Sequence, residues 1–143
     1  MLHTVVHDLM FPLRPEFAVV SALAGVPTSR VQWLVRKVTR RAIRDAAITN
    51  SVLLAVLRSL GFESGTGGDN SLQPLPFNWF LKHHMYLLKH GPMIVRLTSH
   101  ALVIDKDRFV DHLHLTPAPI PEAAAKWRVK AYQCVKRSAE LDT

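Results

Sequence analysis

Three side chains in the second half of the chain have the types and the spacing of a general base with an orienting acid. His100 directly precedes an apolar run, residues 101–104, Asp105 ends that run, and Asp111 follows the next charged turn. Imidazole has a pKa near neutrality, so a histidine that a carboxylate orients can take up and return a proton. The sequence therefore offers His100 as a candidate base, with Asp105 or Asp111 as its partner.

Eight histidines raise the question of a metal site. His112 and His114 would share one face of a strand, and His83 and His84 stand next to each other in an earlier segment. Zinc requires three or four ligands in a defined geometry, and the sequence contains neither an HExxH motif nor a Cys/His finger. We therefore expect scattered surface histidines, no metal and no other cofactor.

A run of basic residues offers a different chemistry, the binding of anions. Arg36, Arg40 and Arg44 recur every four residues, so on a helix they would share one face, with Lys37 and Arg41 beside them. Such a stripe can follow the phosphates of a nucleic acid, or it can face solvent or an acidic partner protein. Aromatic residues are sparse near this stripe, so stacking of single-stranded bases is not indicated.

Composition limits the class of protein. The chain has 143 residues, of which 48% are hydrophobic and 20% charged, which fits one folded domain and excludes a disordered or collagen-like chain. The single cysteine, Cys134, excludes an internal disulfide. No apolar run is long enough to span a bilayer and no signal-peptide pattern is present, so we expect no membrane insertion and no secretion. The net charge of +7 favours acidic partners.

Helices come first along the chain and strands later, which predicts an α+β fold. Helical spacing of apolar residues predicts helices over residues 15–24, 29–40, 52–60 and 77–89. Pro15 suits the start of the first helix, and Leu57 is expected in the core. Residues 63–76, rich in glycine and proline, are expected to form a loop.

In the second half of the chain, the spacing of apolar residues changes from the helical period to the two-residue period of a strand. Alternating apolar residues predict an antiparallel meander over residues 93–98, 100–105 and 108–112. A Pro-rich link then leads to a predicted C-terminal helix over about residues 121–140. Its Trp127 and Tyr132 lie among basic residues, a composition typical of interfaces, so this helix would cap its own sheet or dock on a neighbouring subunit.

Several motifs follow one another in a fixed order. They are the small-residue step at 22–27, the segment from Ile48 to Phe62, the pair Phe80-Leu81, and the hairpin at 91–105 followed by Val110-Asp111. This order resembles small phage-encoded proteins of the papain superfamily that are related to bacteriocin-processing peptidases. The resemblance implies a single domain with an extended N-terminal segment (1–14), a peptidase-like core (15–112) and a Pro-rich link with the C-terminal helix (113–143).

The departures from the family pattern concern the nucleophile. The Asp-Cys pair that opens the family's first helix is matched by Glu16-Phe17, and phenylalanine has no lone pair with which to attack a carbonyl. Ser99 replaces the glycine before the histidine. Three other candidate nucleophiles are less suitable. Ser21 lies one turn deeper on the first helix, and Ser51 suits a helix cap. Cys134 lies outside the matched region.

We therefore expect a degenerate site of Phe17, His100, Asp105 and Asp111, with the Phe17 ring against His100, in a protein that is not an enzyme. It would bind a protein partner or self-assemble, as a virion component or a host-directed factor in the host cytoplasm. The alternatives are an active hydrolase, either a peptidase or a peptidoglycan amidase, with an unrecognised nucleophile, and a basic nucleic-acid-binding module.

Overall fold

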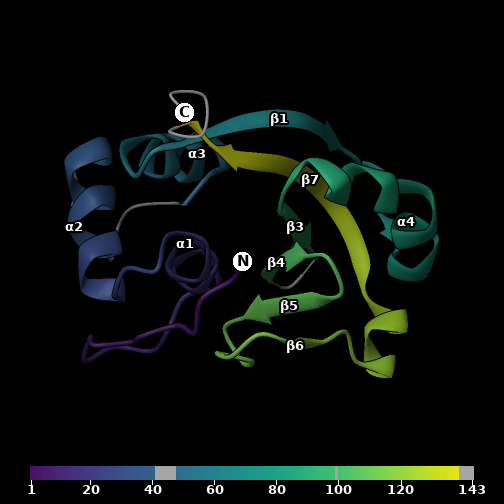
Figure 1. Ribbon diagram of the computed structural model, residues 1–143, viewed down its shortest axis with the longest axis horizontal. Coiled ribbons are helices and arrows are strands. Elements are labelled where there is room, and N and C mark those ends of the chain that lie inside the picture. The colour runs from purple at the N-terminus through teal and green to yellow at the C-terminus, as the bar shows by residue number, and fades with distance from the viewer. Residues whose placement is uncertain (41–47, 99, 139–143) are drawn as a thin grey trace.

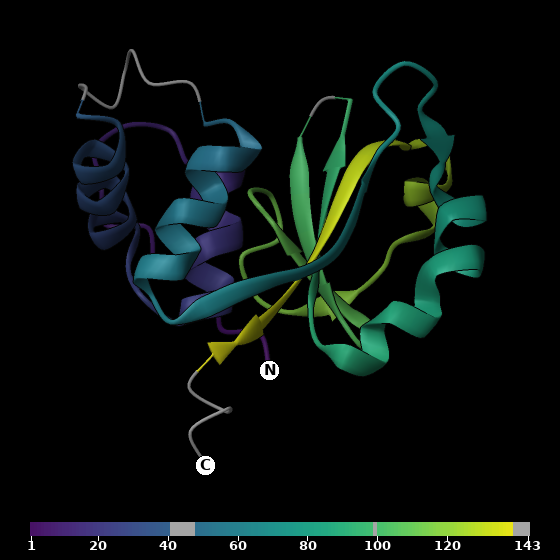
Figure 2. The same cartoon turned by 90° about the horizontal axis from the view of Figure 1, so that it is seen from above.

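The computed structural model describes residues 1–40, 48–98 and 100–138, and it shows helices on both faces of an antiparallel sheet (Figure 1). Figure 2 shows these layers from above, with the purple and blue N-terminal helices on one side of the sheet and the green helical segments on the other. The class is α+β, as the sequence predicts. Within the described ranges, no helix has the length and apolar character needed to cross a membrane.

The three helices on one side are α1 (Pro15–Ala24), α2 (Thr28–Thr39) and α3 (Asn50–Ser59). Pro15 takes the first position of α1, where its missing N–H leaves no bond unmade, and Gly25 ends the helix at a left-handed φ of 70°. The Thr49 hydroxyl accepts a hydrogen bond from the N–H of Val52 at 3.3 Å and so caps α3. The structure confirms all three predicted helices.

Helix α2 receives its cap from a distant part of the chain. The hydroxyl and the backbone N–H of Ser29 donate to the two carboxylate oxygens of Asp8, at 2.6 and 2.8 Å. These hydrogen bonds, that from the Ser29 hydroxyl above all, lower the pKa of Asp8. A carboxylate at a helix N-terminus also interacts favourably with the helix dipole, so the N-terminal segment is fastened to α2.

The sheet of the described residues has seven strands in the order β1-β7-β3-β4-β5-β6, with β2 paired to β7 beside β1. All neighbouring strands are antiparallel. The strands are β1 (Phe62–Asp69), β2 (Leu75–Pro76), β3 (Met93–Leu97), β4 (Ala101–Asp105), β5 (Arg108–Asp111), β6 (Ala118–Pro119) and β7 (Arg128–Arg137).

Two apolar clusters lie on the two faces of this sheet. On strand β4, Val103 faces the cluster shared with α1, α2 and α3, whereas Leu102 and Ile104 face the cluster shared with α4 (Phe77–His84). This alternation follows from the two-residue period of a strand. We call the cluster shared with α1, α2 and α3 the helix-side cluster. Leu57 is 1% exposed within it, which confirms the predicted place of Leu57 in the core.

The predicted C-terminal helix is wrong. Residues 122–126 form the short 3-10 helix η2 (Glu122–Lys126), and β7 follows it as a central strand that pairs with β1, β2 and β3. The buried residues Val129 and Ala131 already alternate as in a strand. The backbone partners that make this segment a strand come from residues 32 or more positions earlier, which no local pattern reveals.

Two further expectations fail nearby. Part of the predicted loop 63–76 is strand β1. Position 68 of this strand has no room for a side chain, because a Cβ on Gly68 would lie 2.6 Å from Cε1 of Tyr132 on β7. The predicted helix 77–89 divides into α4 and the 3-10 helix η1 (Met85–His90). In both places the packing against β7 decides the local conformation.

Candidate functional site

The β3–β4 hairpin positions the candidate base. Arg96 of β3 is paired with Ala101 of β4, and the N–H of Leu97 donates to the carbonyl of His100 at 2.7 Å. His100 therefore stands at the start of β4, at the end of the sheet. Ser99, expected to replace a family glycine, lies outside the described residues.

The structure selects one of the two candidate acids. His100 Nε2 lies 3.5 Å from Oδ2 of Asp111, the last residue of β5, which is opposite Leu102 in the register. Asp105 lies at the other end of β4, where its Oδ2 is 3.1 Å from the N-terminal amine of Met1. His100 and Asp111 thus form the pair, and the expectation that Asp105 belongs to this site is wrong.

Asp111 is held as an anion although it is only 1% exposed. Burial acts to raise its pKa, but hydrogen bonds from the side chains of His100 and His114 and from the amides of Leu113 and His114 outweigh burial and lower the pKa of Asp111 well below its ordinary value. Its Oδ1 accepts from the N–H groups of Leu113 and His114 at 2.9 and 2.7 Å and lies 2.9 Å from Nδ1 of His114. A fixed carboxylate of this kind orients an imidazole and stabilises its protonated form.

Aromatic rings hold His100 in place. The Trp127 ring meets it edge-on at 5.1 Å between centroids, and the His112 ring lies at 5.6 Å. Only 10% of the His100 side chain is exposed. Since Nε2 faces Asp111, Nδ1 lies on the other side of the ring and is the nitrogen with which His100 could transfer a proton to a further group. Trp127, a candidate either for capping its own sheet or for an interface, also contacts the rings of Phe77 and Phe109 of its own chain.

Phe17 lies in the core between the three N-terminal helices. It is fully buried in the helix-side cluster, its ring is 6.3 Å from that of Phe11, and the guanidinium of Arg14 lies 5.9 Å from its centroid. It lines a small apolar space with residues of all three helices: Val20, Val31, Val35, Leu53 and Val56. The ring contacts of His100, by contrast, are with Trp127 and His112, and Trp127 packs against the cluster on the opposite side of the sheet.

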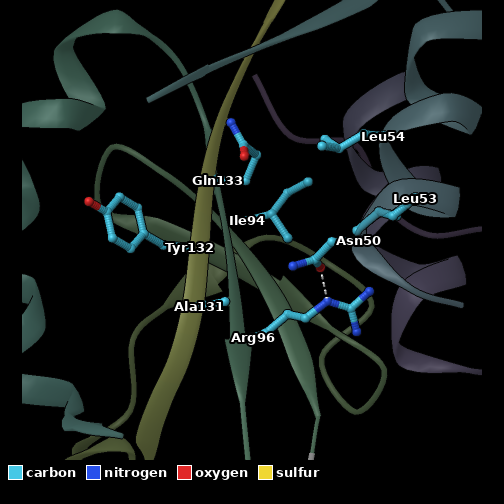
Figure 3. A pocket seen from close by; sticks show the side chains of 8 residues that line it. All are labelled: Asn50, Leu53, Leu54, Ile94, Arg96, Ala131, Tyr132 and Gln133. Carbon is cyan, nitrogen blue, oxygen red and sulfur yellow. Dashed lines mark hydrogen bonds between the residues drawn. The ribbon is translucent and has the colours of Figure 1, made fainter. Parts of the chain in front are cut away.

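Glu16 is the residue of the first turn of α1 that reaches the hairpin. Its Oε2 accepts a hydrogen bond from Arg96 Nη1 at 3.0 Å. Arg96 Nη2 also donates to the carbonyl of Ile48 at 2.9 Å, and its Nε donates to Oδ1 of Asn50, the bond drawn in Figure 3. One guanidinium thus joins the starts of α1 and α3 to the hairpin that carries His100. Sequence analysis missed this contact, and its one signal is the single charge in the otherwise apolar run of β3.

A small pocket of about 10 Å³, with room for about one water molecule, lies beside Arg96 between α3 and the sheet (Figure 3). Its apolar part comes from Leu53 and Leu54 of α3 and Ile94 of β3, and Ala131 of β7 adjoins them. Its polar part comes from the side-chain amides of Asn50 and Gln133, while the Tyr132 side chain points to the other side of β7, where it contacts Phe80 and His84 (Figure 3). An apolar surface with a few polar groups at its margin is the common composition of a binding site.

The other candidate residues lie away from His100. Cys134 is opposite Met93, at the end of β3 remote from the hairpin, and burial raises the pKa of its thiol. Ser21 is 1% exposed on α1, and the cap of α3 is Thr49 rather than Ser51. Tyr132 contacts Phe80 and His84 of its own chain. Among the described residues, no group of three or more His, Cys, Asp or Glu side chains is placed to hold a metal ion.

The comparisons with known proteins bear on this arrangement. No protein-family model and no curated protein matches the chain. A solved structure does: a double-glycine motif protease from an AMS/PCAT transporter, determined in complex with its leader peptide, has a TM-score of 0.57 and 16% sequence identity, over 96% of this chain and 92% of that one. The chain has the papain-like peptidase fold.

This likeness corrects the expectation that the protein is not an enzyme, because the papain-like fold it shares is that of a protease. That expectation rested on Phe17 in the place of the nucleophile. Phe17 points into the core between the helices, and Glu16 is the residue that reaches the hairpin.

Proposed function

We propose that this chain binds a peptide, or an extended segment of a partner protein, in the pocket between α3 and the sheet. The observation that carries the proposal is the composition of this pocket, in which aliphatic side chains adjoin Asn50, Arg96 and Gln133. The shared fold adds support, because the papain-like neighbour was crystallised with a leader peptide.

The surface around the pocket suits a chain with an aliphatic side chain followed by exposed peptide groups, and the pocket, at about 10 Å³, must widen to admit that side chain. Leu54, which is partly buried, offers apolar surface to that side chain, whereas Ile94 is 2% exposed. Asn50 Oδ1 accepts from Arg96 and Gln133 Nε2 donates to the carbonyl of Gly65, so Asn50 Nδ2 is the donor and Gln133 Oε1 the acceptor offered to a peptide backbone. The basic charge of the protein favours acidic segments among such partners.

A screen of immobilised peptides, followed by titration calorimetry on those selected, tests the proposal. Leu54→Asp places a charge at the apolar part of the pocket and is expected to weaken binding at least 10-fold. Val38→Asp is the matched control, because Val38 is a partly exposed aliphatic residue on α2 outside the pocket. Equal affinity in both variants, or no peptide bound by the wild type, would refute the proposal.

Hydrolysis of a peptide is the second candidate, and the His100–Asp111 pair, which does not line the pocket, favours it. The substrate would be a peptide or a peptidoglycan amide, and His100 would act as the base toward a nucleophile still to be identified. Mass spectrometry of each selected peptide after incubation with the protein tests this directly. Cleavage that is lost in both His100→Gln and Asp111→Asn, with binding retained, is the expected result for a hydrolase, and intact peptide throughout excludes it.

The order of the sequence motifs supports a phage-encoded protein, acting in the virion or on a host protein, and we propose this setting as well. Quantitative mass spectrometry of purified particles distinguishes the two roles. A constant number of copies in each particle supports a virion component, and absence from particles supports a host-directed factor.

A further inference from the structure

Helix α2 carries a basic surface on the side that faces away from the sheet, at the outer edge of the molecule in Figure 1. At about 100° per residue, Arg30, Trp33, Arg36 and Lys37 fall within an arc of about 120°. Arg40 follows directly at the C-cap in a left-handed conformation, with φ 58°. We call these five residues the α2 basic face. Arg41 and Arg44, expected to extend the stripe, lie outside the described residues.

Trp33 stands in the middle of this face and is 49% exposed. The guanidinium of Arg30 lies 4.8 Å from its ring centroid, and the ammonium of Lys37 lies 4.9 Å from it. Cations at these distances are attracted to the electron-rich face of an indole. The sequence expectation that aromatic residues are sparse here is therefore wrong, because an exposed tryptophan is placed between the charges.

The positive charges of the α2 basic face have no carboxylate partner within the described ranges. The ion pairs found there involve other basic groups, those of Met1, Arg96, His100, His114 and Lys136. Asp8 lies at the start of α2, but its carboxylate is engaged by Ser29 and Thr28. Four like charges on one helix repel one another, which an anionic ligand would relieve.

We propose that the α2 basic face binds single-stranded nucleic acid, with its four cations on the phosphates and Trp33 against a base. Phosphate contacts account for the charges, and base stacking accounts for a large aromatic ring left half-exposed among them. An acidic protein surface would need the charges but not the indole. This site is separate from the pocket beside Arg96, so the proposal stands or falls independently of the proposed function.

Fluorescence anisotropy with a labelled oligothymidylate, measured over a series of salt concentrations, tests the charges. The triple variant Arg36→Gln, Lys37→Gln, Arg40→Gln is expected to reduce the slope of log K against log salt by about 2, at about 0.7 for each phosphate that the protein no longer neutralises. The matched control makes the same change of net charge at three exposed lysines elsewhere in the chain: Lys82, Lys89 and Lys126. Equal effects of the two triple variants would overturn the proposal, as would a wild type that does not bind at low salt.

The tryptophan supplies the second measurement. Trp33→Ala is expected to weaken oligothymidylate binding about 10-fold, within the range for one stacked base. Trp79→Ala is the control, because Trp79 on α4 is 46% exposed and outside the α2 basic face. An unchanged affinity in Trp33→Ala would overturn the stacking role. Tighter binding of polyglutamate than of the oligonucleotide would assign the face to an acidic protein instead.

Discussion

Replacing Arg96 by methionine removes the side chain that joins α1, α3 and the β3–β4 hairpin. Methionine keeps much of the length and apolar stem of arginine, so the change removes the hydrogen bonds with little loss of volume. The guanidinium donates to Glu16, to the carbonyl of Ile48 and to Asn50, and the Glu16 carboxylate is left without this partner in the variant.

The magnitude follows from burial and charge. The side chains of Arg96 and Glu16 are 21% and 17% exposed, so their ion pair is partly shielded from water. A hydrogen bond to a charged group contributes about 1.5–3 kcal/mol, and solvent screening reduces the ionic share. We expect Arg96→Met to lower the free energy of unfolding by about 2–4 kcal/mol, with a coupling energy of about 1 kcal/mol between Arg96 and Glu16.

Urea unfolding of the two single variants and of the Arg96→Met, Glu16→Gln double variant gives both numbers. The control cycle uses Glu63 and Lys136, an ion pair of 3.3 Å whose side chains are 36% and 50% exposed, for which about 0–1 kcal/mol is expected. A loss below about 0.5 kcal/mol in Arg96→Met, the range of ordinary surface changes, would refute the view that this side chain joins the two layers.

Three other perturbations have definite expected outcomes. Leu57→Ala leaves a cavity in the helix-side cluster and should cost about 2–5 kcal/mol by chemical denaturation, and a cost below about 0.5 kcal/mol would be inconsistent with its burial. The folded pKa of Asp111 lies below its unfolded value of about 3.9, so Asp111 stabilises the fold above that pH, and this contribution is lost as the pH falls further. Asp111→Asn should show less loss of stability on acidification than the wild type, and equally steep curves would contradict the assignment. Gly68→Ala should lower the midpoint of thermal unfolding, because its Cβ would meet the Tyr132 ring, and an unchanged midpoint would place that ring elsewhere.

Local signals predict part of the fold well. Pro15, Gly25 and Thr49 fix the ends of helices through contacts within a few residues, and the alternation around His100 fixes the hairpin in the same way. Strand β7 could not be predicted so, because its conformation depends on β1 and β3, which lie far away in the chain. Intrinsic strand preference is weak compared with such context.

In the candidate site, too, contacts between residues near in the sequence are predictable and contacts between distant residues are not. The sequence offers Asp105 and Asp111 as partners of His100, because all three belong to one meander with short turns, and only the structure distinguishes the two acids. The contacts of Arg96 with Glu16 and Asn50 span 80 and 46 positions of sequence, and only the packed helices reveal them. Phe17 lies in the core and Glu16 contacts Arg96, and only the packing of α1 shows which of these neighbours faces the hairpin, since neighbouring positions on a helix differ by about 100°.

The central place of β7 has a consequence for the order in which the protein folds. It pairs Arg137 with Phe62 and Cys134 with Met93, so it closes loops of many tens of residues. Until it is in place, β1 has no partner among the strands described, and β3 has only β4. During synthesis these strands leave the ribosome before β7, with unpaired edges that other chains can approach. Folding rates fall as contacts become less local, so formation of this sheet should be slow and should depend on β7, which is made after the strands with which it pairs.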